Sequence, residues 1–254
     1  MKKLLFWMVL IVGVIAVIGA CSKSDDSKSS DATASVTSCS ETASGSITGI
    51  DNQSLSGTYS VMLQYAGISG IDNDTGCTTS TDIMAGFSSQ VASGASSFNY
   101  LKVVTSSTTY ATVMKSYSDT SCSTEMASLV IGYTDVTIGD NVTGLTTGNG
   151  SIGTTGTKAT SKQYCMKGKG TTDNGTAWLN TYTSDSGITY VTGEEKISGA
   201  SGATYYHLWH SDNTSKAGVS GYPDFLGNVW RERQSTSAYP TDWTDSGALD
   251  AFQR

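Results

Sequence analysis

Short segments rich in β-forming residues follow one another along most of this chain, with turn residues between them. In the first segment, residues 55–68, the side chains of Tyr59, Val61, Leu63 and Tyr65 occupy every second position. A period of two predicts a strand that buries one face. The later segments are not separated by the long helical spacers that parallel βαβ units require, so the pattern predicts an all-β fold.

Composition supports the same fold class. The 254 residues include 13 Tyr and 28 Gly but only 2 Pro, and Ser and Thr are abundant. Tyr and Thr suit pleated, half-solvated surfaces, whereas Gly, Asn and Asp form the turns between strands. After the first strand, we expect further strands at residues 98–105, 108–117, 129–138, 158–167, 188–197, 203–210 and 225–234.

The links between these strands predict hairpins. Ser106-Ser107 joins the strands 98–105 and 108–117, and Gly199-Ala200-Ser201-Gly202 joins the strands 188–197 and 203–210. Gly139-Asp140-Asn141 is expected to end the strand before it. Elsewhere we expect a Gly/Thr-rich loop at 144–156, one or two helical turns at 176–182, and either a short helix or a strand at 81–93.

About eight strands in serial hairpin order close most economically into an up-and-down antiparallel barrel, because closure removes the exposed sheet edges. A two-sheet β-sandwich is the alternative architecture. Roughly 200 residues follow the N-terminal polar segment, and this length fits one domain better than two.

The N-terminus predicts export. Lys2 and Lys3 precede an apolar run at residues 4–18, and small residues follow at Gly19-Ala20. This is the pattern of a signal peptide. The sequence Ile18-Gly19-Ala20-Cys21 resembles the lipobox of bacterial lipoproteins, which implies a diacylglycerol on Cys21 and cleavage before it. The alternative is an uncleaved transmembrane anchor, because the run is near the lower limit for crossing a bilayer.

The lipobox resemblance also implies a location and a domain order. Ser22 follows the cysteine, without the aspartate that signals inner-membrane retention in some enterobacteria, so we expect a bacterial outer-membrane lipoprotein on the periplasmic or outer face. The polar residues after Cys21 cannot bury enough apolar surface to fold, and they predict a flexible tether. The expected order is a signal peptide at 1–20, an acylated tether at 21–46, a β-domain at 47–234 and a C-terminal tail at 235–254.

The net charge excludes some partners. The chain carries 15 basic and 22 acidic residues, and loss of Lys2 and Lys3 with the signal leaves 13 basic residues and a net charge of −9. An acidic chain is a poor ligand for nucleic acid or bare anionic lipid, because both are bound by basic side chains. The membrane partner would therefore be reached through the acyl chains.

The remaining cysteines, Cys39, Cys77, Cys122 and Cys165, predict disulfides in an oxidising compartment. Four cysteines allow three connectivities, and the sequence alone does not choose among them. A zinc site is the competing interpretation, but there is no Cys-x-x-Cys pair to begin one.

Two short motifs carry a further family resemblance across residues 54–140. The stretch Leu55-Ser56-Gly57-Thr58-Tyr59 is similar to the Gly-x-Trp start of calycin or lipocalin-like barrels, with Tyr59 in place of Trp. Tyr117-Ser118-Asp119-Thr120-Ser121-Cys122, followed by Gly132-Tyr133 and Ile138-Gly139, resembles an arrangement in small secreted bacterial β-barrel proteins and in the extracellular lipocalin-like domain of the APC-down-regulated protein family. The resemblance implies a lipocalin-like barrel and suggests a Cys77–Cys122 bridge, which leaves Cys39 and Cys165 as the second pair. It supplies no catalytic residues.

The polar residues give little support to catalysis. His207 and His210 are three apart on an expected strand and point to opposite sides, so they do not predict a shared metal. Glu194 and Glu195 are adjacent and face opposite ways, which excludes a close carboxylate pair. Asp72-Asn73-Asp74 fits a turn better than a calcium loop. We therefore expect no catalytic residues, no metal and no cofactor.

Aromatic residues gather in the C-terminal third of the chain. Tyr205, Trp209 and Trp230 are the candidate ligand-binding residues, because in a lipocalin-like barrel they would line a cavity for an apolar or amphipathic molecule. The alternative is that they form ordinary core. Tyr206, Tyr222, Phe225 and Trp178 belong to the same group.

Together these features favour a membrane-anchored, extracytoplasmic lipoprotein with a non-enzymatic β-domain. The domain would bind an apolar small molecule or an envelope protein. The alternatives are a surface-anchored hydrolase, and a structural surface protein that acts through protein contacts. The Gly/Thr-rich loop at 144–156 would suit the last of these.

Overall fold

The computed structural model describes residues 36, 38–61, 71–72, 76–79, 81–146, 154–199, 202–212, 229–243 and 249–253. The expected signal peptide and Cys21 lie outside the described residues, as do most of the expected tether, the end of the first expected strand, the middle of the loop 144–156, and the segment with Tyr222 and Phe225.

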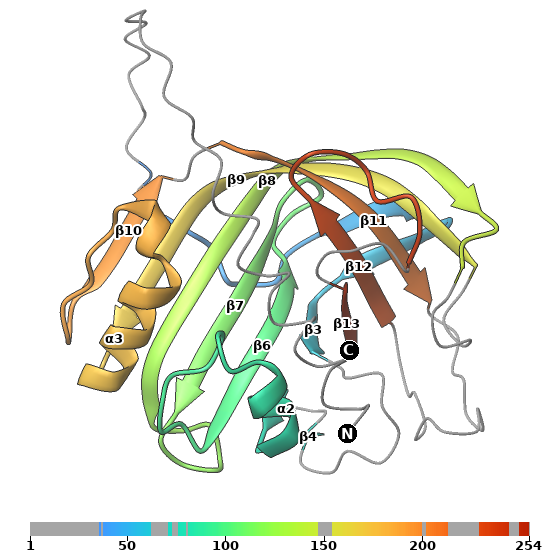
Figure 1. Ribbon diagram of the computed structural model, residues 1–254. Coiled ribbons are helices and arrows are strands. Elements are labelled where there is room, and N and C mark those ends of the chain that lie inside the picture. The colour runs from blue at the N-terminus through green and yellow to red at the C-terminus, as the bar shows by residue number, and fades with distance from the viewer. Residues whose placement is uncertain are drawn as a thin grey trace, which may run out of the picture.

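Strands dominate the described chain (Figure 1). The elements are β1 (Ser46–Ile50), β2 (Gln53–Ser56), β3 (Thr58–Val61), β4 (Ile71–Asp72), β5 (Cys77–Thr78), α2 (Thr81–Gly86), β6 (Ser97–Val104), β7 (Tyr110–Tyr117), β8 (Glu125–Thr143), β9 (Thr155–Gly170), α3 (Asp173–Tyr182), the short 3-10 helix Ser184–Ser186, β10 (Glu195–Gly199), β11 (Thr204–Asp212), β12 (Val229–Ser235) and β13 (Leu249–Gln253).

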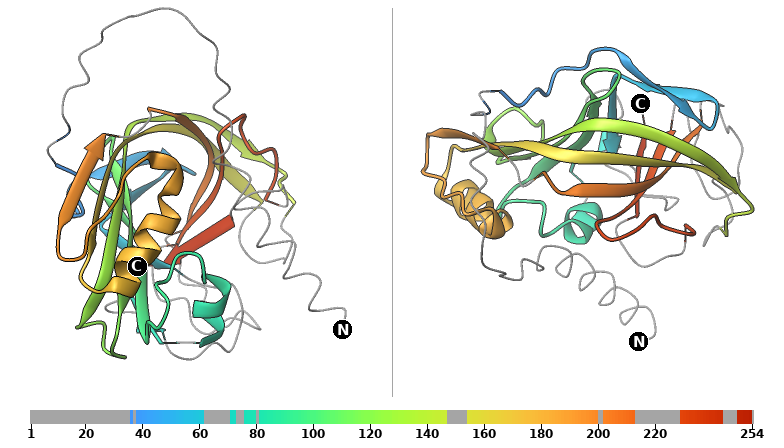
Figure 2. Two further views of the ribbon diagram at one scale, coloured as in Figure 1. Left: turned by 60° about the vertical axis from the view of Figure 1, so that its left-hand side comes forward. Right: turned by 90° about the horizontal axis from the view of Figure 1, so that it is seen from above.

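The main sheet is antiparallel and strongly curled, which confirms the expected all-β, up-and-down fold. Neighbours in the sheet follow chain order from β6 through β7, β8, β9, β11 and β12 to β13. β3 then pairs on one side with β13 and on the other with β6, so among the described residues the two ends of the sheet meet at β3. The views in Figures 1 and 2 show the long strands β8 and β9 arching across the molecule.

The hairpin expected at Ser106-Ser107 is confirmed, with Val104 of β6 opposite Tyr110 of β7. The turn expected at 139–141 is wrong, because β8 continues to Thr143. Its ladder with β9 shifts register between Ile138 and Asn141 and absorbs the Gly-Asp-Asn stretch as an irregularity within the strand.

The hairpin expected between 188–197 and 203–210 is also wrong. β10 and β11 both pair with β9, β10 along residues 165–169 and β11 along residues 157–162, so they follow one another along the same edge. The segment before β10 forms no strand at Tyr190. There the Asn180 side chain accepts from the backbone N–H of Tyr190 and donates to its carbonyl, and so replaces a ladder partner.

The residues expected to form a C-terminal tail, 235–254, contribute a strand, β13. In β13, Phe252 lies opposite Trp230 of β12 on one side and opposite Val61 of β3 on the other. The sheet therefore extends beyond the expected domain boundary at 234.

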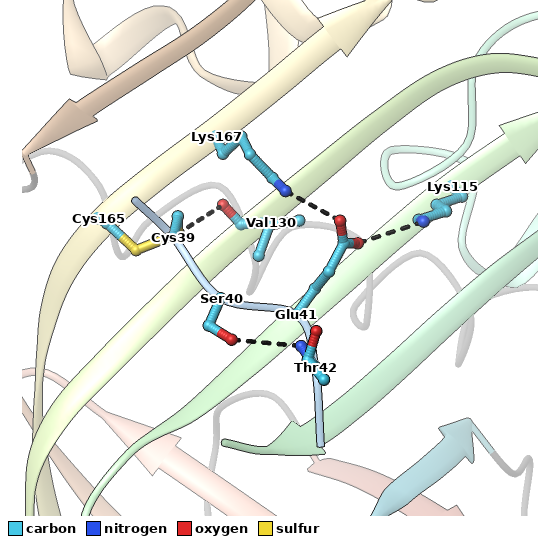
Figure 3. A network of polar contacts seen from close by, with 8 residues as sticks. All are labelled: Cys39, Ser40, Glu41, Thr42, Lys115, Val130, Cys165 and Lys167. Atoms are coloured by element: carbon cyan, nitrogen blue, oxygen red, sulfur yellow. Dashed lines mark hydrogen bonds and ion pairs between the residues drawn. A yellow bond between two sulfur atoms is a disulfide. The ribbon is translucent and has the colours of Figure 1, made fainter. Parts of the chain in front are cut away.

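The N-terminal segment crosses the outer face of the sheet, as Figure 3 shows. Cys39 is disulfide-bonded to Cys165 of β9. Glu41 pairs with Lys115 of β7 at 3.2 Å and with Lys167 of β9 at 2.9 Å. We call residues 38–44 the strap. The described part of the expected tether is thus fastened to the domain rather than free of it.

The strap explains why some strands are buried on both faces. Ala111 and Val113 point outward from β7 and pack in one apolar cluster with Cys39, Cys165 and neighbouring side chains. Gly132 of β8 makes room for the bridge, because a Cβ there would lie 2.3 Å from Cys165 Sγ. Two-sided burial of β7 follows from the chain folding back over its own sheet.

The second disulfide joins Cys77 of β5 to Cys122, in the loop after β7. Both pairings are those expected: the family resemblance suggests Cys77–Cys122, which leaves Cys39 and Cys165 as the second pair. The two bridges join residues separated by 126 and 45 positions, so they constrain very different lengths of chain.

The β1–β2 hairpin joins the core at one end of the sheet. Its turn residues Asp51 and Asn52 have φ of 49° and 63°, which fits the type I′ turn that two-residue hairpins favour. Its side chains Ile47, Ile50 and Leu55 are buried with Tyr110 and Trp209 in the main core.

Helix α3 packs against another part of the same hydrophobic core. Thr172 caps it by accepting from the Gly175 N–H. Gly175 lies against β8, since a Cβ there would stand 2.0 Å from the Met126 carbonyl oxygen. Trp178 donates its indole N–H to the Ser89 carbonyl and so links α3 to the segment after α2. None of the described helices is long and apolar enough to cross a membrane.

We predict that loss of the strap disulfide destabilises the domain more than loss of the Cys77–Cys122 bridge. In the chain-entropy model the longer closed loop is worth about 1 kcal/mol more. Denaturant unfolding of Cys39→Ser/Cys165→Ser and of Cys77→Ser/Cys122→Ser, each compared with the wild type, measures this. An equal or larger loss in the second variant would contradict the strap's role.

Candidate functional site

A buried ion pair crosses the interior of the curled sheet. Lys102 of β6 and Glu232 of β12 lie 2.6 Å apart, Nζ to Oε2, and each side chain is only 3% exposed. β3 and β13 lie between these two strands in the sheet, so the pair connects side chains across the interior rather than along a ladder. Burying two charges costs several kcal/mol per ion unless each is well compensated.

Aromatic rings surround the lysine. Its Nζ lies 5.1 Å from the ring centroid of Tyr110, 5.7 Å from that of Tyr133 and 5.9 Å from that of Trp230. Ring faces attract a cation at these distances. Lys102 therefore has both an anionic partner and an aromatic enclosure.

The other carboxylate oxygen of Glu232 faces β11. Trp209 donates its indole N–H to Oε1 at 3.2 Å. His207 Nδ1 lies 2.8 Å from the same oxygen, although the approach is not aligned with an ideal N–H hydrogen bond. Two strands, β6 and β11, thus bring compensating groups to the one carboxylate that β12 carries.

The chain of polar contacts continues from His207 to β9. His207 Nε2 is 2.8 Å from Ser161 Oγ, and the Tyr110 hydroxyl lies 3.3 Å from the same Oγ. Ser161 and His207 are almost completely buried, at 1% and 0% exposure. The site is a continuous line of groups from hydroxyl to imidazole to carboxylate to ammonium.

The electrostatics favour a neutral histidine between the charged groups. Burial lowers the pKa of His207, and the Lys102 charge lowers it further, against the opposing effect of Glu232. Burial alone would raise the pKa of Glu232, but Lys102 and His207 outweigh it and hold the pKa well below the ordinary 4.5. Burial raises the pKa values of Tyr110 and Tyr133, which keeps both hydroxyls protonated.

The three residues predicted to bind a ligand lie beside this line. Trp209 and Trp230 have zero exposure, and their rings pack edge to face with centroids 5.2 Å apart. Tyr205 is only partly buried, and its hydroxyl donates to Gln163 at 3.1 Å. The structure therefore brings all three into one interior and leaves Tyr205 nearest to solvent.

The two histidines have separate surroundings, as their spacing predicts. His210 Nδ1 lies 2.6 Å from Asp51 Oδ2 at the tip of the β1–β2 hairpin, whereas His207 faces Ser161 and Glu232. Within the described part of the chain, no group of three or more His, Cys, Asp or Glu side chains is placed to hold a metal ion.

Lys102, Ser161 and Glu232 are not among the site residues that the sequence predicts. A signal existed for the first of them, because Lys102 shares the inward parity of Phe98, Tyr100 and Val104, the buried face of β6. A lone charge on the apolar face of a predicted strand needs a buried partner. The partner itself lies 130 positions away and could not be found from local pattern.

No protein-family model matches the chain, and no curated protein matches it significantly.

We predict that His207 makes the domain less stable as the pH falls below the ordinary histidine pKa of 6.5. In that range the unfolded chain binds a proton that the folded chain does not, so stability decreases with acidification. Denaturant unfolding at about pH 7.5 and about pH 5.5 should show a smaller loss for His207→Gln than for the wild type. An unchanged or steeper pH dependence in the variant would contradict this.

Proposed function

We propose that the chain is a lipid-anchored protein of the bacterial outer membrane, held by an acylated Cys21, whose β-domain binds another protein of the envelope. The lipobox and the acidic charge balance support the anchor, and the oxidised cysteines fit an exported chain. The proposal includes a lipocalin-like barrel for the β-domain, which the sequence resemblance implies.

The strap supports a mechanical link between anchor and domain. Cys39 is covalently fixed to β9, and Glu41 adds two ion pairs beside it. The chain between Cys21 and Cys39 could reach about 60 Å at full extension. An anchor at Cys21 would therefore hold the domain near the membrane and transmit force to the sheet through a disulfide.

The packed interior is the observation that carries the choice of a protein partner. Trp209, Trp230 and Tyr110 fill the space between the strands with their own rings, and none of the three is exposed. A ligand at the two tryptophans would have to displace them, so we favour contacts through the outside of the domain over an apolar small ligand.

One edge of the sheet suits such a contact. Among the described strands, β10 pairs only with β9, so its other edge can accept an extended segment of a partner. Val191, four residues before β10 in the chain, is 48% exposed and offers an apolar side chain at the surface. The alternative, a structural surface protein, would also act through protein contacts.

We predict that Cys21→Ala abolishes lipid labelling and releases the protein from the membrane fraction, because the acyl chains provide the attachment. Ser22→Ala is the matched control, since it keeps the cysteine and should remain attached. Metabolic lipid labelling with cell fractionation measures both.

Two results would overturn the proposal. Unchanged membrane attachment of Cys21→Ala, together with no lipid label on the wild type, would remove the anchor. Native mass spectrometry that finds a stoichiometric apolar molecule on the purified protein would favour the small-ligand alternative over the protein partner.

A further inference from the structure

Three buried side chains on adjacent strands have the order of groups that activates a serine. Ser161 Oγ on β9 lies 2.8 Å from His207 Nε2 on β11, and His207 Nδ1 lies 2.8 Å from Glu232 Oε1 on β12. Nucleophile, base and orienting carboxylate at these separations define the general arrangement of nucleophilic catalysis, whatever their order in the chain. We propose that Ser161, His207 and Glu232 form a site that hydrolyses short carboxylic esters.

The chemistry would proceed in two balanced steps. Ser161 Oγ bonds to the ester carbonyl carbon while its proton moves to His207 Nε2, and the alcohol leaves with that proton as its C–O bond breaks. Water then attacks the acyl-serine, one of its protons returns through His207 to Ser161 Oγ, and the carboxylic acid departs. Glu232 positions the imidazole and is not itself protonated.

Three neighbours complete the arrangement. The Tyr110 hydroxyl, 3.3 Å from Ser161 Oγ, can donate to the oxygen that becomes negative during attack. Lys102 and Trp209 hold Glu232 from other directions and fix its orientation.

Tyr205 gives the route to this site. It lies directly opposite Ser161 in the β9–β11 ladder, and its ring lies over His207 with centroids 6.4 Å apart. The pairing of β12 with β11 ends at Tyr206, so Tyr205 stands at the end of that wall and is only partly buried. Movement of this one ring, with loss of its hydrogen bond to Gln163, would expose the serine.

The surroundings limit the substrate. The partly buried side chains Met166, Tyr182 and Ile188 pack against the same core as Tyr205. Ser161 and His207 are themselves 1% and 0% exposed, so little room is available around the reacting hydroxyl. A small ester fits such a buried site better than a polymeric substrate.

A fluorophosphonate probe tests the proposal, with peptide mapping of the modified residue. The wild-type protein should be labelled at Ser161, and Tyr205→Ala should be labelled faster because the route is open. His207→Gln should slow labelling at least about 100-fold, the usual contribution of a general base. Ser161→Ala should remove the label, whereas Ser116→Ala, which changes another buried serine, should not.

Circular dichroism and the retained disulfides establish that each variant is folded. Absence of a Ser161 adduct in both the wild type and folded Tyr205→Ala would overturn the proposal, as would equal labelling rates for the wild type and His207→Gln. Hydrolysis of p-nitrophenyl acetate that disappears in Ser161→Ala would support it. These outcomes are independent of membrane attachment, so they can fail while the anchored binding role stands, and success would replace the expectation of a non-enzymatic domain.

Discussion

The buried carboxylate of Glu232 is the group on which the interior of this protein depends. A charge so far from water must be matched by groups that are held in place, and here they come from β6 and β11 as well as from the neighbouring aromatic core. Lys102, His207 and Trp209 can all reach Glu232 only if the sheet curls enough to bring β6 opposite β12. The polar network and the curvature therefore require one another.

The strap imposes a second constraint from outside. Curling the sheet buries the concave face, but β7 and β8 also carry apolar side chains on the convex face, including Val113 and Val130. The residues around Cys39 cover them, and the disulfide to Cys165 keeps the cover in place. The chain that would lead to the membrane is thus part of the packing of the domain.

β-forming composition and turn chemistry predict most strands of the closed sheet, although β6, β7 and β11 bury side chains on both faces and not only on one alternating set. The failures have local causes. Residues 188–197 contain β-forming side chains, but Asn180 binds the backbone at Tyr190 and delays the strand to Glu195. The strand that closes the sheet is instead β13. Its five residues follow a polar stretch of sequence and show little alternation of apolar and polar side chains. The site was the least predictable part, since Ser161 is one of many serines and Glu232 gains its meaning only from distant strands.

The most direct measurement is the ionisation of Glu232 in the folded protein, followed by the carbon NMR shift of its carboxyl group during an acid titration. The structure predicts that the signal stays at its ionised position through the ordinary glutamate pKa of 4.5 and below, for as long as the protein is folded. The signal should move toward normal titration in Lys102→Met. A wild-type Glu232 that titrates at or above 4.5 would contradict the buried network and the interior built around it.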